Sequence, residues 1–189
     1  MRSYNPWDYV FDFLAVRRPV RTDVLVVEGW LWNSLLRRAA EQFREGGYRL
    51  VVVTGIGVSA DPSMRVQQTA RRLTALGVPE SCIETAGGRA RRFHKTAAAG
   101  RALGKWLDAR PSISAVNIVT HAPHARKTFV IYRRLLGRRI KVGIIPVMSE
   151  DMATIRRRRG FRFSLGLALY FAKQLFGSIY AALWPFSAA

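Results

Sequence analysis

The segment from Val119 to Arg126, with the sequence VTHAPHAR, gathers a hydroxyl, two imidazoles and a guanidinium within eight residues. It follows an apolar run and precedes a helical pattern, which places Thr120, His124 and Arg126 at a strand-to-helix turn. The free amides and the dipole of a helix start favour an anion. The pattern therefore predicts a site for a phosphate or a carboxylate. The alternative is that Thr120 caps the helix while the histidine and arginine side chains are solvated.

Glu28 directly ends another apolar run and precedes a glycine, Gly29. A carboxyl group at such a position can act as a general base, as a metal ligand or as the acceptor for a sugar hydroxyl. The alternative is a structural ion pair with one of the many arginines. If the site is catalytic, we expect Glu28 or His124 to transfer a proton, with Gly29 beside the ligand. Whether the site catalyses or only binds stays open.

The segment TGIG, from Thr54 to Gly57, follows a further apolar run, and its glycines allow a ligand to approach the backbone. It lacks the third glycine of a dinucleotide fingerprint and the Lys-Ser/Thr pair of a P-loop. A plain turn and a turn that cradles a ligand through Thr54, Gly55 and Gly57 are therefore both open. Thr96 is a further candidate, because it begins a helix after the basic loop 87–92. That loop is alternatively a solvated face.

Apolar runs alternate with helical patterns along most of the chain. The expected strands are Val24–Val27, Leu50–Val53, Ile83–Thr85, Val116–Thr120 and Val142–Pro146, and the expected helices between them are Asn33–Glu45, Asp61–Leu76, Lys95–Leu107 and Pro123–Leu136. Such alternation predicts an α/β fold, a Rossmann-like three-layer sandwich with a mainly parallel five-stranded sheet in the order 3-2-1-4-5. Ligands of such sheets bind outside the carboxyl ends of the strands. The candidate residues above should converge there.

The composition describes one folded domain with a strong excess of positive charge. The 189 residues are 49% hydrophobic, and 31 Lys and Arg stand against 12 Asp and Glu, a net charge of +19. This charge attracts nucleic acid, anionic lipid or small anions. Nucleic acid is disfavoured because no helix-turn-helix, zinc-finger or RNP pattern is present. The single cysteine, Cys82, excludes an intramolecular disulfide and a four-ligand zinc site, and we predict no metal.

The two ends of the chain indicate where in the cell the protein is expected to be. The N-terminal extension, 1–21, is expected to form a helix over Tyr4–Val16, whose Asp8 and Asp12 argue against a signal peptide and for a cytoplasmic protein. The C-terminal segment, 149–189, joins an arginine run, 156–159, to an apolar helix. That order is typical of a membrane-surface anchor, whereas Lys173 and Gln174 at the helix centre disfavour spanning.

We prefer a helix that packs on the core. Helical spacing places a stripe of apolar residues on one face, which we expect to be mostly buried, namely Phe163, Leu167, Phe171, Leu175, Ile179 and Leu183. The last residues, Trp184–Ala189, are then expected to project and to contact lipid. Peripheral contact with the inner membrane therefore stays open.

An ordered set of motifs over about residues 22–148 resembles the SanA/YdcF/ElyC-like family of bacterial proteins. The motifs are DVLVVEGW at 23–30, GGY at 46–48 leading to VVTG at 52–55, LGVP at 76–79, and VT at 119–120 with HAR at 124–126. The resemblance implies a Rossmann-like sandwich, a polar pocket at the strand ends and a role in the cell envelope or its polysaccharides. It also implies S-adenosylmethionine as a candidate ligand.

The sequence departs from the family pattern at two places. Many relatives have an acidic residue where this chain has Arg65, and another before the helix-starting threonine, where this chain has His94-Lys95-Thr96. Both changes add positive charge to the expected pocket and leave Glu28 as the main candidate acid. Relatives are often tethered by an N-terminal membrane helix, which we do not find here.

The resulting expectation is a YdcF-like protein that binds or acts on a nucleotide-like or sugar-phosphate ligand in envelope or exopolysaccharide metabolism. The alternative is a non-enzymatic basic protein that binds the membrane surface or nucleic acid.

Overall fold

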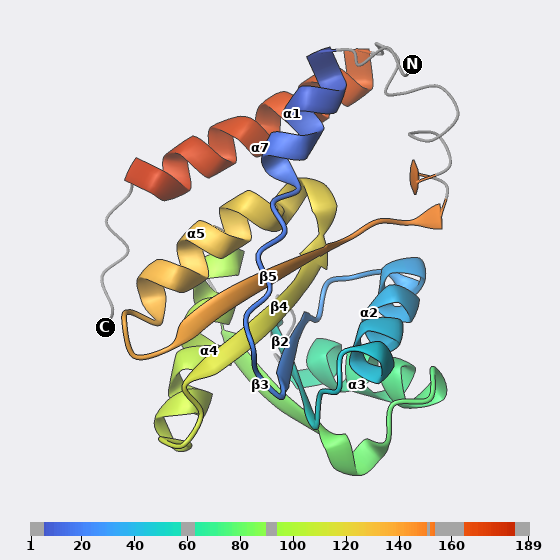
Figure 1. Cartoon of the computed structure of the whole chain (residues 1–189), viewed down its shortest axis with the longest axis vertical. Helices are drawn as coiled ribbons and strands as arrows, with labels where there is room; N and C mark the ends of the chain where they lie inside the picture. The colour runs from blue at the N-terminus through green and yellow to red at the C-terminus, as the bar shows by residue number, and fades with distance from the viewer. Residues whose placement is uncertain (1–5, 58–62, 90–93, 151, 154–164, 184–189) are drawn as a thin grey trace.

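Five parallel strands form the centre of the computed structural model, which describes residues 6–57, 63–89, 94–150, 152–153 and 165–183 (Figure 1). The strands lie in the order β3-β2-β1-β4-β5, which confirms the predicted topology. Their bounds are β1 Val24–Glu28, β2 Leu50–Gly57, β3 Ile83–Arg89, β4 Ala115–His121 and β5 Lys141–Val147. All four pairings are parallel, so the carboxyl ends of the strands share one edge of the sheet.

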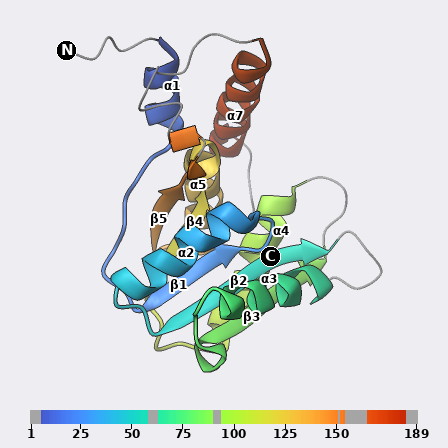
Figure 2. The same ribbon diagram turned by 90° about the vertical axis from the view of Figure 1, so that its right-hand side faces the viewer.

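Helices cover both faces of this sheet (Figures 1 and 2). Their bounds are α1 Pro6–Leu14, α2 Asn33–Glu45, α3 Ser63–Ala75, α4 Lys95–Asp108, α5 Ala125–Leu135 and α7 Leu165–Leu183, with short 3-10 turns η1 Glu80–Cys82 and η2 Ala122–His124. Leu25 and Val27 of β1 pack with residues of α2 and α3, whereas Val24 and Val26 pack with α4 and α5. This alternation follows from the two-residue period of a strand.

The same period assigns the polar residues at the strand ends to one face. Glu28 continues the series Val24, Val26 of β1, and Thr54 follows Val52 of β2 by two residues. Both therefore belong to the face that α4 and α5 cover. The sequence thus places a carboxyl and a hydroxyl side by side in the sheet, under the same two helices.

α1 and α7 pack together at one end of the molecule (Figures 1 and 2). Phe171 of α7 is fully buried against Phe11 and Leu14 of α1 and Ala122 of η2. α7 also contacts α5 along its length. Within the described part of the chain, no helix has the length and apolar character needed to cross a membrane.

The predicted apolar stripe on α7 is only partly correct. Phe171 is buried and Leu175 is half-buried, but the side chains of Ile179 and Leu183 are 46% and 79% exposed. The buried face is instead made by Phe171 together with small and polar residues, namely Gln174, Ser178 and Ala181. Close approach to α5 explains this, because a side chain on Gly177 would meet Lys127 at 3.1 Å. Phe163, the arginine run 156–159 and residues 184–189 lie outside the described residues, as does the side chain of Leu167.

Two expected boundaries also differ. β3 runs to Arg89 rather than ending at Thr85, because Gly87 and Gly88 pair with Gly55 and Ile56 of β2. Thr120 does not cap the following helix, since a 3-10 turn, η2, separates β4 from α5. The segment Asp61–Pro62, expected to open α3, lies outside the described residues.

Candidate functional site

A cavity of about 730 Å³ lies at the carboxyl ends of β1 and β2, under α4, α5 and α7. Its size is within the range of small-molecule binding sites, roughly 300–1,000 Å³. Its polar and charged lining residues are Glu28, Trp30, Thr54, Arg65, His94, Lys95, Thr96, His124, Lys127, Tyr170, Lys173, Gln174 and Tyr180. The cavity therefore lies where the topology of a parallel sheet places ligands.

Glu28 is the one acidic residue among the described lining residues, and it is 1% exposed. Thr120 donates a hydrogen bond from its hydroxyl to the carboxyl group, and the Trp30 side chain also hydrogen bonds to it. Burial raises the pKa of Glu28 from 4.5 to about 7, although both hydrogen bonds and the charge of Lys127 act in the opposite direction. Glu28 can therefore gain or lose a proton near neutral pH.

Lys127 of α5 brings a positive charge toward this carboxyl. Burial lowers the pKa of Lys127, the negative charge of Glu28 raises it, and the neighbouring Lys173 lowers it again. Our sequence analysis missed Lys127. The signal was its position three residues after His124, because residues three apart share one face of a helix.

Four basic side chains from four helices line the cavity: Arg65 of α3, Lys95 of α4, Lys127 of α5 and Lys173 of α7. None of them takes part in an ion pair with another described residue. The cavity thus carries an excess of positive charge, which suits an anion.

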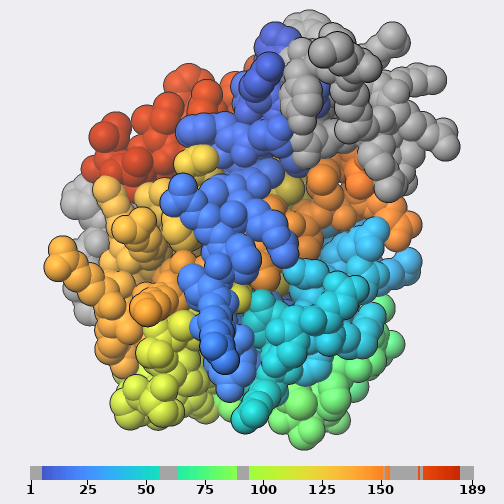
Figure 3. Space-filling model, in the orientation of Figure 1, coloured from blue at the N-terminus to red at the C-terminus, as the bar shows by residue number. Residues whose placement is uncertain are grey.

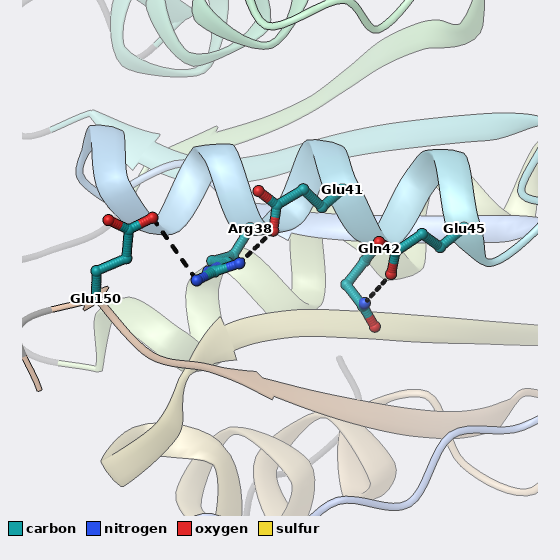
Figure 4. A network of polar contacts seen from close by, with 5 residues as sticks. All are labelled: Arg38, Glu41, Gln42, Glu45 and Glu150. Carbon is teal, nitrogen blue, oxygen red and sulfur yellow. Dashed lines mark hydrogen bonds and ion pairs between the residues drawn. The ribbon is translucent and has the colours of Figure 1, made fainter. Parts of the chain in front are cut away.

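Several acidic residues of the molecule are engaged elsewhere. On α2, which covers the opposite face of the sheet, Arg38 pairs with Glu41 at 2.8 Å and with Glu150 at 3.7 Å (Figure 4). Gln42 hydrogen bonds to Glu45 on the same helix (Figure 4). These carboxylates belong to a surface network and do not line the cavity.

His124 lines the cavity, and its ring meets the ring of Trp30 edge-on at 4.9 Å between centroids. Burial, followed by the positive charge of Lys127, lowers the pKa of His124 to about 3. The imidazole is therefore neutral at neutral pH and a weak base. Of the two groups expected to transfer a proton, Glu28 has the pKa that suits the task.

Thr54, Gly55 and Thr96 also line the cavity, as expected. Thr54 donates its hydroxyl hydrogen to the carbonyl of Ala99 at 3.0 Å. Its side chain also interacts with the buried hydroxyl of Tyr132, so that Thr54 links β2 to α4 and α5.

Two of the predicted glycines, Gly29 and Gly57, do not line the cavity. Gly29 does not line the cavity, because its N–H donates to the carbonyl of Thr54 at 2.6 Å and its carbonyl accepts from Thr69 at 3.1 Å. Gly57 does not line it either, since β2 continues through Gly57, which pairs with Arg89. The TGIG segment is therefore strand, and neither proposed turn is present.

Thr120 and Arg126 also do not line the cavity. Thr120 is fully buried and its hydroxyl is directed to Glu28, so that it positions the carboxyl instead. The Arg126 side chain turns toward α1, where its Nε donates to the carbonyl of Phe13 at 2.5 Å and its guanidinium lies 3.8 Å from the centre of the Phe13 ring. Arg126 therefore holds α1 in place.

α7 supplies the part of the site that our sequence analysis did not find. Tyr170, Lys173, Gln174, Gly177 and Tyr180 line the cavity. Gln174 is 2% exposed, and its Oε1 has no hydrogen-bond partner among the described residues. A ligand with a hydroxyl or N–H group could satisfy this oxygen.

Among the described residues, no three His, Cys, Asp or Glu side chains gather closely enough to hold a metal ion. Comparisons of the chain with models of protein families, with curated proteins and with solved structures found no match. The resemblance to the SanA/YdcF/ElyC-like family therefore rests on the sequence motifs alone.

Proposed function

We propose that the cavity binds a small phosphate-bearing molecule, nucleotide-like or a sugar phosphate, and that Glu28 exchanges a proton with it. The observation that carries this proposal is the buried Glu28 carboxyl, which has a pKa of about 7 and shares the cavity with four basic side chains. The described lining residues include no second acid. The basic groups neutralise the anion, while the carboxyl acts at the reacting atom.

The charges also set the order of proton transfer. A bound phosphate adds negative charge near Glu28, which favours the protonated carboxyl. Glu28 then donates its proton to an oxygen of the bound ligand, which becomes a hydroxyl group while Glu28 becomes a carboxylate, and the reverse transfer restores both groups. Lys127, close enough to influence the carboxyl electrostatically, stabilises the negative charge that develops on either side of this transfer.

The remaining groups of the cavity wall indicate what else the ligand carries. The buried Gln174 has an Oε1 without a hydrogen-bond partner among the described residues, and Trp30 and Tyr180 present aromatic rings to the cavity. A sugar or nucleoside with free hydroxyl groups supplies a donor to Gln174 and an apolar face to the two rings.

S-adenosylmethionine does not suit this site. Its sulfonium and ammonium groups would enter a cavity that already holds four basic side chains and a carboxyl that is half protonated near pH 7. We therefore assign it no role in the reaction.

The resemblance to SanA/YdcF/ElyC-like proteins supports a place for the ligand in envelope or exopolysaccharide metabolism.

A thermal-shift screen of nucleotides, sugar phosphates and S-adenosylmethionine tests the proposal. A ligand at one hundred times its Kd stabilises the folded protein by about 2.7 kcal/mol. We expect a sugar phosphate or a nucleotide to do so, and we expect Lys127→Gln to lose most of the shift. The matched control is Lys105→Gln, an exposed lysine of α4 outside the cavity.

Two results would contradict the proposal. One is a panel in which no phosphate-bearing compound stabilises the parent protein. The other is a ligand that stabilises Lys127→Gln as strongly as it stabilises the parent and Lys105→Gln, because binding would then lie outside the cavity.

A further inference from the structure

The outer face of α7 is apolar. We define this face as Leu169, Phe176, Ile179 and Leu183, whose side chains are 62%, 70%, 46% and 79% exposed. Their spacing of three, four and seven residues aligns them along one side of the helix, nearly opposite to the buried Phe171 and Ser178. Single exposed apolar residues are ordinary, but a continuous line of them marks an interaction surface.

The rest of this end of the molecule adds to the apolar character. α7 lies on the surface of the space-filling model, beside α5 (Figure 3). α1, which packs on α7, exposes Phe13 by 47% and Tyr9 by 66%. Two adjoining helices therefore present large apolar side chains at the same end.

The protein as a whole is strongly basic, with a net charge of +19. The C-terminal part of the sequence that contains α7, residues 109–189, holds 14 Lys and Arg but only two acidic residues, Glu150 and Asp151. α7 itself has Lys173 exposed and no acidic residue. Arg134 of α5 donates to the carbonyls of Ala181 and Ala182 at the end of α7, so basic charge also lies beside the last turn.

We propose that the outer face of α7 docks on the surface of an anionic lipid bilayer. The helix lies in the plane of the membrane, with its exposed Leu, Ile and Phe side chains among the acyl chains nearest the headgroups. The surrounding Lys and Arg contact the negative headgroups. In the sequence, the arginine run 156–159 precedes the helix, an order that is typical of membrane-surface anchors.

A second copy of the chain is the competing occupant of this face. Two copies would bring two strongly basic surfaces together, which costs electrostatic energy, whereas an anionic bilayer complements them. The charge therefore favours the membrane.

Co-sedimentation with lipid vesicles tests this inference on the full-length protein. The vesicles are phosphatidylcholine alone or phosphatidylcholine with about 30% phosphatidylglycerol, at physiological salt. We expect binding to the anionic vesicles and little to the neutral ones. The double variant Phe176→Gln/Leu183→Gln should lower the partition coefficient roughly tenfold or more, because it removes two large apolar groups. Met64→Gln, a 60% exposed apolar residue of α3, should bind as the parent does.

A fluorescent label reports the contact directly. In a Cys82→Ser background, the dye NBD attached to Phe176→Cys should shift to the blue on anionic vesicles, whereas the dye on Met64→Cys should not. The inference is overturned if the parent ignores anionic vesicles, if Phe176→Gln/Leu183→Gln binds them as the parent does, or if the dye at position 176 does not respond. It is also overturned if the parent is a dimer that this double variant dissociates, with no binding to vesicles.

Discussion

At the scale of single residues, the environment of Glu28 opposes its charge. The side chain is buried, and the hydrogen bonds from Thr120 and Trp30 together with the charge of Lys127 only partly offset the cost of desolvation. Ionisation of this buried carboxyl therefore lowers the stability of the folded protein. Such costs are common at functional sites, where a shifted pKa serves the chemistry.

This cost predicts a pH dependence. Because the pKa of Glu28 is higher in the folded protein than in the unfolded chain, its contribution to stability is present below pH 4.5 and is lost as the pH rises through about 7. We expect the free energy of unfolding of Glu28→Gln, relative to that of the parent, to rise by about 2–3 kcal/mol between pH 5 and pH 8. Urea unfolding at several pH values measures this difference.

Two buried histidines have the opposite effect on the pH dependence of stability. The effect of Glu28 must therefore be measured as a difference between the variant and the parent. Burial lowers the pKa values of His121 and His124 to about 4 and about 3. The stability that these side chains contribute to the folded protein is therefore lost as the pH falls below 6.5. Their contributions are common to the parent and to Glu28→Gln and cancel in the comparison. A difference that stays constant from pH 5 to pH 8 would show that Glu28 titrates normally.

The residue scale also shows why Arg126, which was predicted, does not line the cavity, whereas Lys127, which was not predicted, does. A helix turns by 100° per residue, so Arg126 lies about 200° from His124, whereas Lys127 lies within about 60° of it. The position of Glu28, Thr54 and His124 at the ends of strands was enough to identify them as lining residues. To choose between Arg126 and Lys127, the orientation of α5 was needed, and this depends on its packing against β4 and α7.

At the scale of elements, the strands were predictable and α7 was not. The alternating apolar runs identified all five strands and their order, because a parallel sheet buried on both faces needs such runs. α7 is apolar on nearly every side, so its spacing did not define one buried face. The face that packs was decided by Gly177, Ser178 and Ala181, which allow close approach to α5.

The two faces of α7 predict different effects of truncation. Phe171→Ala should destabilise the protein by about 3–5 kcal/mol, because it empties a fully buried site between α1 and η2. Leu183→Ala should change stability by less than about 0.5 kcal/mol, since the side chain is 79% exposed. Equilibrium unfolding in urea measures both. Equal effects of the two substitutions would contradict this orientation of the helix.

At the scale of the whole molecule, the site exists only in the assembled fold. β1 supplies the acid, and α3, α4, α5 and α7 each supply one basic side chain. The net charge of +19 adds a long-range attraction for anions, which salt weakens. The sign of this charge follows from the composition, whereas the cavity depends on α7, which lies far along the chain and covers the edge of the sheet.

The most direct test of the account is an NMR titration of the Glu28 carboxyl. The protein is labelled with ¹³C at glutamate side chains, and the Glu28 signal is identified by its loss in Glu28→Gln. Inorganic phosphate then serves as the probe anion, with Lys105→Gln as the control for Lys127→Gln.

We expect Glu28 to titrate with a pKa of about 7 in the free protein. Phosphate should raise this pKa further in the parent and in Lys105→Gln, and much less in Lys127→Gln, because Lys127 helps to hold the anion beside the carboxyl. A Glu28 signal that titrates near 4.5, or one that phosphate leaves unchanged in the parent, would contradict the assignment of this cavity as an anion site with an acid–base carboxyl.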